Sequence, residues 1–466
     1  MTFDITLDTA GKNPLFLQIA ARVRSAIAVG QLIPGQRLPS SRALAAQLDI
    51  ARGTVDAAYA LLASEGAIET RRPAGTIVAG EVGRRVGVPE QSPLLFPGAR
   101  SIERTAPRPF QMGLPALDAF PRKQWASLMV QAVRSIQPTD LMEIASAGTF
   151  ELRHSIAAYL GGARGITCAP EQVLITSGYQ GALALVRSVL IRPGDPVWME
   201  DPGYHMARMA FENAGARVVP VRVDAEGLRV SAGINAAPKA KLAAVTPTHQ
   251  YPTCVALSLP RRLELLAWAK EAGSWILEDD YDSEFRYAGR PLPSLKSLDR
   301  GQRVLYAGSF SKVLFPALRL GYLIVPPELE GAFLRASSLL TCGLPTLEQR
   351  VVAAFMRSGQ FARHIRRMRM LYAERRQGLA ATLRAVFGNR MTVEMAPGGM
   401  HLLVRFQGAD DDSLLSKRAE QVGLAATALS SLAMAHDCGQ GLLISFTNVI
   451  PSDAAALVER LMGAVR

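Results

Sequence analysis

Residues 308–322 read GSFSKVLFPALRLGY and hold one lysine, Lys312, with Ser309 and Ser311 just before it. Arg319 follows seven residues later, and the apolar run YLIV comes next. A lysine among hydroxyl groups, with an arginine nearby, can form a Schiff base beside a bound phosphate group. A loop with a solvated lysine has the same composition, so the rest of the chain must decide between the two interpretations.

The lysine stretch lies in a region where strand-like and helix-like runs alternate. The strand-like runs are VLITSG, PVWMED, ARVVPVRV, LAAVTP, SWILEDDY and RVLYAGS, and helical runs end at Val189, surround Phe211 and span Arg261 to Ala272. This alternation predicts a parallel sheet with helices on both faces. Ligands of such sheets bind beyond the carboxyl ends of the strands, so the loops there are the places to search.

Two of these loops have features that suit a phosphorylated ring. Ser177, Gly178 and Tyr179 open a helix, where backbone N–H groups can bind a phosphate. Tyr204 follows a Pro-Gly turn that can present its ring as a stacking surface. The ordinary alternatives are a helix cap at Ser177 and a packed core aromatic at Tyr204.

The run WILEDDY places Asp279 and Tyr281 two residues apart and therefore on one face of a strand. A carboxylate there can keep a pyridine nitrogen protonated, and a tyrosine beside it can hydrogen-bond a phenolic oxygen. Asp279 can equally be an ordinary salt-bridge partner.

The order and spacing of these residues resemble fold type I aminotransferases, which bind pyridoxal 5′-phosphate (PLP). The resemblance runs from about Gln111 to the carboxyl terminus. It implies that Lys312 forms the internal aldimine and Asp279 pairs with the pyridine nitrogen, while Tyr281 bonds the ring oxygen and Tyr204 stacks on the ring. It assigns the phosphate to Ser177, Gly178, Tyr179, Ser309, Ser311 and Arg319.

The sequence departs from the aminotransferase pattern in three places. Leu443 stands where those enzymes usually carry an arginine for the substrate carboxylate, and an apolar side chain cannot pair with a carboxylate. The usual PTG motif reads PTC at 252–254, and Glu143 stands about where many relatives have a tyrosine. Arg208 and Arg405 remain as candidates for binding an effector carboxylate.

Residues 12–80 predict three helices followed by two short strands, which is a winged helix-turn-helix. Apolar residues recur at helical spacing from Pro14 to Val29, Ser40 is placed as the N-cap of the second helix, and the two strands flank a turn at Pro73 to Gly75. The stretch closely resembles the DNA-binding domain of GntR-family bacterial regulators, in its LPSxR and R-x-TV elements and in the GT of the wing. A small helical assembly module with solvated arginines is the alternative.

In that arrangement the third helix is the recognition helix. Arg52 and Thr54 at its amino end are expected to reach base edges, and Ser40 and Arg42 to bind DNA phosphate. The wing, including Gly75, carries Arg71 and Arg72 towards the minor groove or the backbone.

The predicted organisation is therefore an α/β multidomain chain. It comprises a winged helix-turn-helix (12–80), a linker (81–108) and a PLP-binding fold type I aminotransferase-like effector domain (109–466) with a parallel-rich central sheet and a smaller C-terminal α+β part. Both halves in this order resemble the MocR subfamily of GntR regulators. The resemblance implies double-stranded operator DNA, an amine, amino acid or PLP as effector, and a head-to-tail, domain-swapped homodimer. Two alternatives stay open, namely a working aminotransferase that also binds DNA and a vestigial site that serves only dimerisation.

Composition agrees with a soluble cytoplasmic protein. The chain has 466 residues and a formal net charge of +12, which is compatible with nucleic acid without proving it. Its start lacks the features of a signal peptide, and no uncharged apolar run approaches membrane-spanning length. The four cysteines are widely spaced and the six histidines show no metal-ligand spacing, so neither disulfides nor a metal site are expected.

Overall fold

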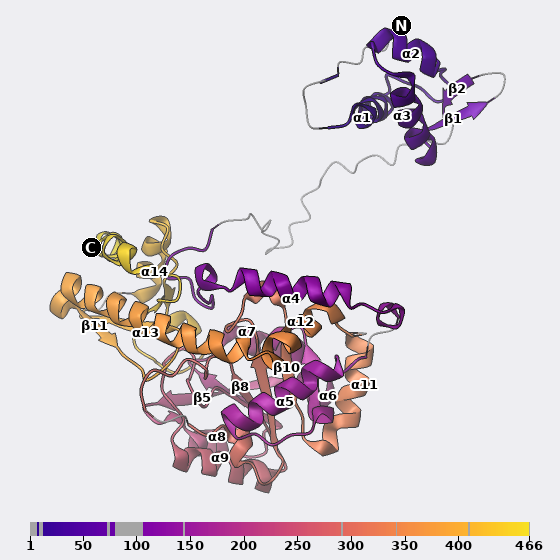
Figure 1. Cartoon of the computed structure of the whole chain (residues 1–466). Coiled ribbons are helices and arrows are strands. Elements are labelled where there is room, and N and C mark those ends of the chain that lie inside the picture. Colours follow the sequence, from indigo (N-terminus) through magenta and orange to yellow (C-terminus); the bar gives the residue numbers. More distant parts are fainter. Residues whose placement is uncertain are drawn as a thin grey trace. The chain divides into compact units, whose positions relative to one another are not determined.

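The computed structural model divides the chain into two compact units, Met1–Glu103 and Arg104–Arg466 (Figure 1). It describes residues 7–8, 13–71, 75–79, 106–142, 145–289, 292–341, 343–408 and 411–465. Most of the predicted linker, together with Glu143 and Arg72, lies outside these ranges. The two units are treated separately below.

The first unit has the predicted three helices and two strands. They are α1 (Leu15–Ala28), α2 (Ser41–Leu48), α3 (Arg52–Ser64), and the antiparallel pair β1 (Ile68–Arg71) and β2 (Gly75–Val78). Ser40 caps α2 as predicted, because its hydroxyl oxygen accepts from the backbone N–H of Ala43. Residues such as Ile19, Leu44 and Leu62 are buried in one small core. The winged helix-turn-helix is confirmed.

The second unit is built on an eight-stranded sheet with the order β3-β10-β9-β8-β7-β4-β5-β6. The strands are β3 (Val173–Thr176), β4 (Pro196–Asp201), β5 (Arg217–Asp224), β6 (Gly227–Leu228), β7 (Leu242–Val245), β8 (Trp275–Asp280), β9 (Val304–Ser309) and β10 (Gly321–Ile324). Neighbouring strands from β9 to β5 in this order are parallel, as predicted.

The sheet is parallel-rich as predicted, and β10 is an exception within it, because it runs antiparallel to both β9 and β3. The segment that joins β9 to β10 contains one short 3₁₀ helix, Pro316–Leu318, and no α-helix that could carry the chain back across the sheet. A parallel pairing needs such a crossover, whereas an antiparallel one does not. The lysine loop therefore connects two adjacent strands at the carboxyl end of β9.

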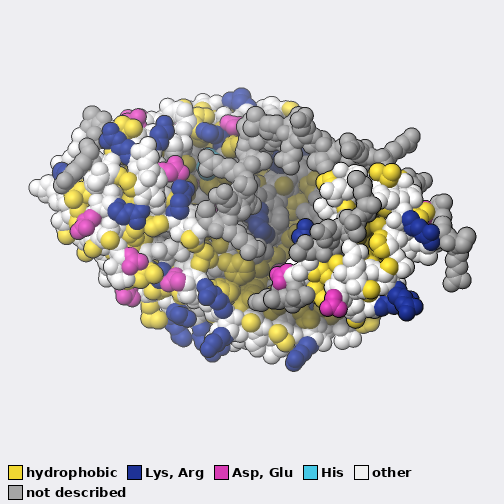
Figure 2. Space-filling model, turned by 90° about the horizontal axis from the view of Figure 1, so that it is seen from above, with side chains coloured by type: hydrophobic (Ala, Val, Ile, Leu, Met, Phe, Trp, Pro, Cys, Tyr) yellow, Lys and Arg dark blue, Asp and Glu magenta, His cyan; other side chains and the backbone are white. Residues whose placement is uncertain are grey.

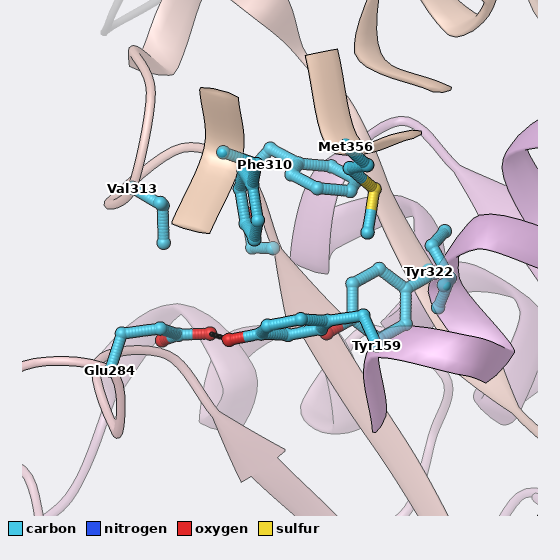
Figure 3. A pocket seen from close by; sticks show the side chains of 9 residues that line it. Tyr159, Glu284, Phe310, Val313, Tyr322 and Met356 are labelled. Carbon is cyan, nitrogen blue, oxygen red and sulfur yellow. Dashed lines mark hydrogen bonds between the residues drawn. The ribbon is translucent and has the colours of Figure 1, made fainter. Parts of the chain in front are cut away.

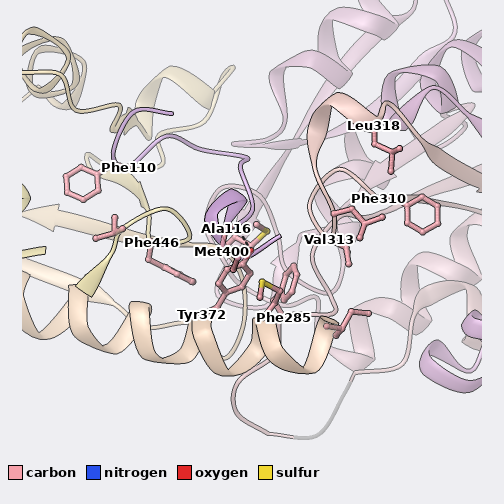
Figure 4. Close-up of a cluster of buried hydrophobic side chains, with 14 of the residues drawn as sticks. Phe110, Ala116, Phe285, Phe310, Val313, Leu318, Tyr372, Met400 and Phe446 are labelled. Carbon is pink, nitrogen blue, oxygen red and sulfur yellow. Dashed lines mark hydrogen bonds between the residues drawn. The ribbon is translucent and has the colours of Figure 1, made fainter. Parts of the chain in front are cut away.

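Alternate residues of the sheet face two separate cores. On β3, Val173 and Ile175 belong to one apolar cluster and Leu174 to another. Figure 4 shows part of the first cluster, in which Phe310 and Val313 of the lysine loop lie with Phe285 and Tyr372. The helices of this unit before the C-terminal part are α4 (Arg122–Arg134), α5 (Phe150–Arg164), α6 (Gly178–Leu190), α7 (His205–Glu212), α8 (Val230–Ala236), α9 (Leu259–Ala272), α10 (Leu295–Leu298), α11 (Glu330–Leu340) and α12 (Thr346–Arg357).

The C-terminal part contains the long helix α13 (Gln360–Phe387), a second sheet and two further helices, as predicted. The sheet is antiparallel with the order β11-β12-β14-β13, formed by β11 (Met391–Glu394), β12 (His401–Phe406), β13 (Thr427–Ala428) and β14 (Leu442–Ser445). Helices α14 (Asp412–Gln421) and α15 (Ala454–Ala464) complete it. Among the described residues, no helix is both long and apolar enough to span a membrane.

The core of the large sheet gives a first test. Leu323 on β10 is fully buried, and we expect Leu323→Ala to lower the free energy of unfolding by about 2–5 kcal/mol, because it removes packed methyl groups and leaves a cavity. Leu339→Ala on α11 is the matched control, since Leu339 is 82% exposed. Urea unfolding followed by tryptophan fluorescence would measure both, and equal effects would contradict the assigned packing.

Candidate functional site

Lys312 lies in the loop between β9 and β10, with its side chain partly buried. Its Nζ donates a hydrogen bond of 2.7 Å to the carbonyl of Gly113. A Cβ at Gly113, whose φ is +81°, would stand 2.7 Å from that Nζ, so a larger residue there would displace the amine. Burial lowers the pKa of Lys312, and the nearby charges of Asp279 and Asp282 oppose this in part. The interpretation of Lys312 as a solvated loop lysine is therefore wrong.

A cradle for an anion lies where α6 begins. Gly178 has a φ of +72°, and a Cβ placed on it would be 4.0 Å from both the Arg319 guanidinium and the Ser311 hydroxyl. Arg319 donates a 3.1 Å hydrogen bond to the carbonyl of Ser177. One guanidinium, one hydroxyl and a helix amino end therefore meet at the predicted phosphate residues.

The cradle is held by the two strands next to it. The backbone N–H of Ser311 donates to the Ser309 hydroxyl at 3.2 Å, which fixes the start of the lysine loop. Gly321 on β10 packs so closely on Gly178 that a Cβ there would meet its Cα at 2.9 Å. The antiparallel β10, which the sequence reasoning did not anticipate, therefore sets the position of the cradle.

Asp279 is a carboxylate near the end of β8. Burial, followed by the charge of Asp280, raises the pKa of Asp279 well above its usual range, and the Tyr179 hydroxyl lowers it in part. Tyr179, predicted at the phosphate, thus turns its hydroxyl towards Asp279, and its ring lies 6.1 Å from that of Tyr204. A protonated ring nitrogen is a suitable partner for such a carboxylate.

Tyr281, directly after β8, belongs to a hydrogen-bonded group that the sequence reasoning did not single out. Its hydroxyl and Oδ2 of Asp282 each lie 3.0 Å from Nδ1 of His249. Burial alone would lower the pKa of His249, but the charges of Asp282 and Cys254 raise it well above its usual range. His249 lies three residues before the PTC stretch at 252–254, and its contact with Tyr281 was not predicted.

Asp201 at the end of β4 fixes a loop of the C-terminal part. Its carboxylate accepts hydrogen bonds from three consecutive backbone N–H groups, those of Met434, Ala435 and His436, at 2.7–2.8 Å. Its neighbour Glu200 is also buried and accepts from the backbone N–H and hydroxyl of Thr246. Nothing in the sequence indicates this long-range contact, because its two ends are more than 230 residues apart.

The residues considered for an effector carboxylate have other environments. Leu443 is buried in an apolar cluster with Leu403 and partly buried Tyr251. Arg405 binds Glu394 and two backbone carbonyls, and Arg208 lies 3.8 Å from Glu212 on the same helix. These contacts favour structural roles for both arginines, and their predicted contact with an effector stays a prediction.

A small enclosed cavity lies behind the lysine loop. Ser309, Phe310 and Val313 line it from the loop, and Tyr159 donates a 3.1 Å hydrogen bond to Glu284 on its other side (Figure 3). Its lining is mostly apolar, so we regard it as a packing defect. Within the described residues, no group of three or more His, Cys, Asp or Glu side chains could hold a metal ion.

The predicted DNA-contacting residues lie at helix starts and on the wing of the first unit. Arg52 is the first residue of α3 and is exposed, and its Nε lies 3.4 Å from Oδ2 of Asp56 one turn later. Thr54 lies between them in the first turn of the helix. Arg42 is an exposed residue at the start of α2.

Gly75 opens β2 with a φ of +82°, and Arg37 lies over it, 3.1 Å from where a Cβ would stand. Arg37 is exposed and was missed by the sequence reasoning. Basic side chains are scattered over the face seen in Figure 2.

The two units define a class of protein in which a winged helix-turn-helix precedes an aminotransferase fold. The family model for bacterial regulatory proteins of the gntR family matches residues 15–78, and that for aminotransferase class I and II matches residues 128–461. The chain belongs to the MocR-type regulators of the GntR family.

Relatives agree with this assignment, and a solved structure agrees with the fold of the second unit. The probable rhizopine catabolism regulatory protein MocR of Rhizobium meliloti is 35% identical over 473 residues, which cover 99% of this chain and 95% of that protein. The pyridoxine biosynthesis regulator PdxR of Corynebacterium glutamicum is 31% identical and covers 92% of this chain and 91% of its own length. The α-aminoadipate aminotransferase LysN of Thermus thermophilus is similar in structure, with a TM-score of 0.70 and 29% identity over 76% of this chain and 91% of that one.

Removal of the Asp201 carboxylate tests whether its hydrogen bonds hold the loop at residues 434–436 in place. We expect Asp201→Ala to lower the free energy of unfolding by about 1.5–3 kcal/mol, since hydrogen bonds to a charged group are lost. Hydrogen exchange at the amides of residues 434–436 should speed up. Asp437→Ala is the control, because Asp437 is exposed and accepts only from nearby Gly439 among the described hydrogen bonds. Unchanged exchange at 434–436 would contradict the role given to Asp201.

Proposed function

We propose that this transcription regulator binds PLP covalently through Lys312 and changes its DNA binding when an amine effector displaces the lysine. The observation that carries the proposal is that Lys312, Asp279, Tyr281 and the Gly178 cradle meet at the carboxyl edge of one sheet. The same chain carries a gntR-family winged helix, which implies DNA binding. A regulator of this kind works in the cytoplasm, where DNA and PLP are both present.

The residues present fit the cofactor that the aminotransferase family implies. Gly178, Ser311 and Arg319 offer a cradle for a phosphate, and the partly buried carboxylate of Asp279 would hold a protonated ring nitrogen. When bound, PLP supplies an aldehyde that links to one amine and can exchange it for another. Tyr281 would hydrogen-bond the phenolic oxygen, and Tyr204 would stack on the ring. These assignments follow the family pattern and the geometry supports them.

The amine of Lys312 is suited to this exchange. Its lowered pKa increases the fraction of the neutral, nucleophilic form. Once displaced, its Nζ has the carbonyl of Gly113 within reach as an acceptor. Gly113 is followed by the segment that leads to α4, so attachment or release of the lysine changes a contact with that segment. Such a difference in contacts is what an effector needs to shift a two-state equilibrium.

The apolar cluster around Leu443 favours some classes of effector over others. Leu443 is buried among Leu403, Leu429 and Leu432, and a carboxylate placed against this cluster would lose its hydration without gaining a counter-charge. This supports an amine effector, or PLP itself, over an α-amino acid held in the way that aminotransferases hold theirs.

Two copies of the chain would bind the operator together. We infer a head-to-tail, domain-swapped homodimer on double-stranded DNA with two half-sites, because one recognition helix covers one half-site. Arg52 and Thr54 would read bases, while Ser40, Arg42 and the wing at Gly75 would contact phosphate. Arg37, which packs on the wing, joins this set.

Replacement of the lysine tests the proposal directly. In Lys312→Ala we expect complete loss of the visible absorption band of the lysine-bound cofactor and loss of the effector's influence on DNA binding, because no other amine occupies this position. Reduction with borohydride followed by peptide mass mapping should place the label on Lys312 in the wild type. Lys270→Ala, an exposed lysine on α9, is the control and should behave as the wild type. An unchanged band in Lys312→Ala would refute the assignment.

A working aminotransferase that also binds DNA is the second candidate, and the likeness to LysN favours considering it. Sustained turnover of an amine and a keto acid, catalytic in protein, would establish it. A single half-reaction that stops after one equivalent would support the regulator.

Loss of the predicted base contact tests the DNA interface. We expect Arg52→Ala to weaken specific binding by about 1–3 kcal/mol while binding to random duplex weakens less, since a base contact carries sequence information and a phosphate contact does not. The operator would first be selected from random duplexes with the purified protein. Arg22→Ala on the exposed face of α1 is the charge-matched control. Equal losses on operator and random duplex would remove Arg52 from base readout.

A further inference from the structure

A cysteine and two histidines meet behind Tyr281, in a group that the proposed function does not use. The Sγ of Cys254 lies 3.1 Å from Nε2 of His401, which projects from β12 of the C-terminal part. His249, from the loop that also carries Cys254, lies with its ring centre 5.8 Å from that of His401. Cys254, His249 and His401 are all buried.

The backbone at Cys254 gives an independent observation. Its φ of +64° falls in the left-handed region, where a side chain is disfavoured and glycine is the usual occupant. A hydrogen bond of 2.8 Å from its N–H to the carbonyl of Gln250 holds that conformation. The chain therefore keeps a side chain where glycine would be less strained, and such outliers cluster at functional sites.

The charges around the thiol distinguish it from the other described cysteines. Burial alone would raise the pKa of Cys254, but the charges of His401 and His249 lower it to about 6. Burial raises the pKa of both Cys168 and Cys438, although both are more exposed than Cys254. Within the described residues, Nε2 of His249 is also buried without a hydrogen-bond partner.

We propose that Cys254 is an oxidation site for small peroxides, with His401 as its proton donor. The thiolate attacks one peroxide oxygen, so that an S–O bond forms and the O–O bond breaks. Sulfur is oxidised to the sulfenic acid, and the departing hydroxide takes the proton of the His401 imidazolium and leaves as water. His249 connects the site to Tyr281 through the 3.0 Å contact at its Nδ1, so oxidation changes the surroundings of Tyr281.

Competition among the cysteines of the full-length protein is the first test, and it does not depend on bound cofactor. At pH 6.5 we expect iodoacetamide to label Cys254 about ten-fold or more faster than Cys168 and Cys438, because the thiolate is the reactive form. Hydrogen peroxide followed by dimedone should trap the sulfenic acid on the same peptide, as read by mass spectrometry. If Cys254 is labelled only after denaturation, or Cys168 and Cys438 react first, the proposal fails.

The pH dependence of labelling tests the role of His401. The titratable groups that face Cys254 are His401 on β12, His249 and Tyr251 in its own loop, and Tyr281 and Asp282 beyond His249. We expect His401→Gln to move the midpoint of labelling to higher pH, with the wild-type rate recovered near pH 9. His154→Gln, an exposed residue on α5, should leave the midpoint unchanged. An unchanged midpoint in His401→Gln would overturn the proposed role of His401. Slow labelling of this variant at every pH would show that His401 has only a structural role.

Discussion

Burial of carboxylates along β8 and just beyond it is the constraint on which the large unit depends. Buried charges are costly unless each has its own partner. Asp280 is paired with Arg164 at 2.6 Å, Glu278 accepts from the backbone N–H groups of Leu295 and Lys296, and Asp282 lies against His249. These partners come from different elements, so the acidic stretch draws helix α5, the segment at α10 and the loop after β7 together around one strand.

Asp279 differs from its neighbours in this respect. No ion pair of Asp279 occurs among the described residues, although the Tyr179 hydroxyl lowers its pKa in part and its charge acts on nearby Lys312. Glu278 and Asp280 have partners within the protein, whereas Asp279 is partly exposed near the end of the strand. A protonated ring nitrogen would supply the missing positive charge. Binding of such a ligand would therefore offset the folding cost of Asp279, and this is the coupling that a sensor would use.

The sequence was sufficient for those features that depend on local pattern. Helix caps, alternating runs and the residues at strand ends follow from periodicity and turn chemistry, so the winged helix, the strands around Asp279 and the lysine loop were predictable. Contacts between distant segments were not. The antiparallel direction of β10, the Gly113 carbonyl at Lys312 and the Asp201 contact with residues 434–436 each join parts of the chain that no local pattern connects.

Leu443 and Cys254 show how two departures from one family pattern can have different physical meanings. Leu443 is packed among leucines, so the core accommodates an apolar side chain at the position where the family pattern has an arginine. Cys254 has a left-handed backbone conformation and two histidine neighbours. The cysteine that stands in place of the usual glycine of the PTG motif therefore adds a reactive group. The first change argues against retained turnover of amino acids. The second places a thiol one histidine away from Tyr281.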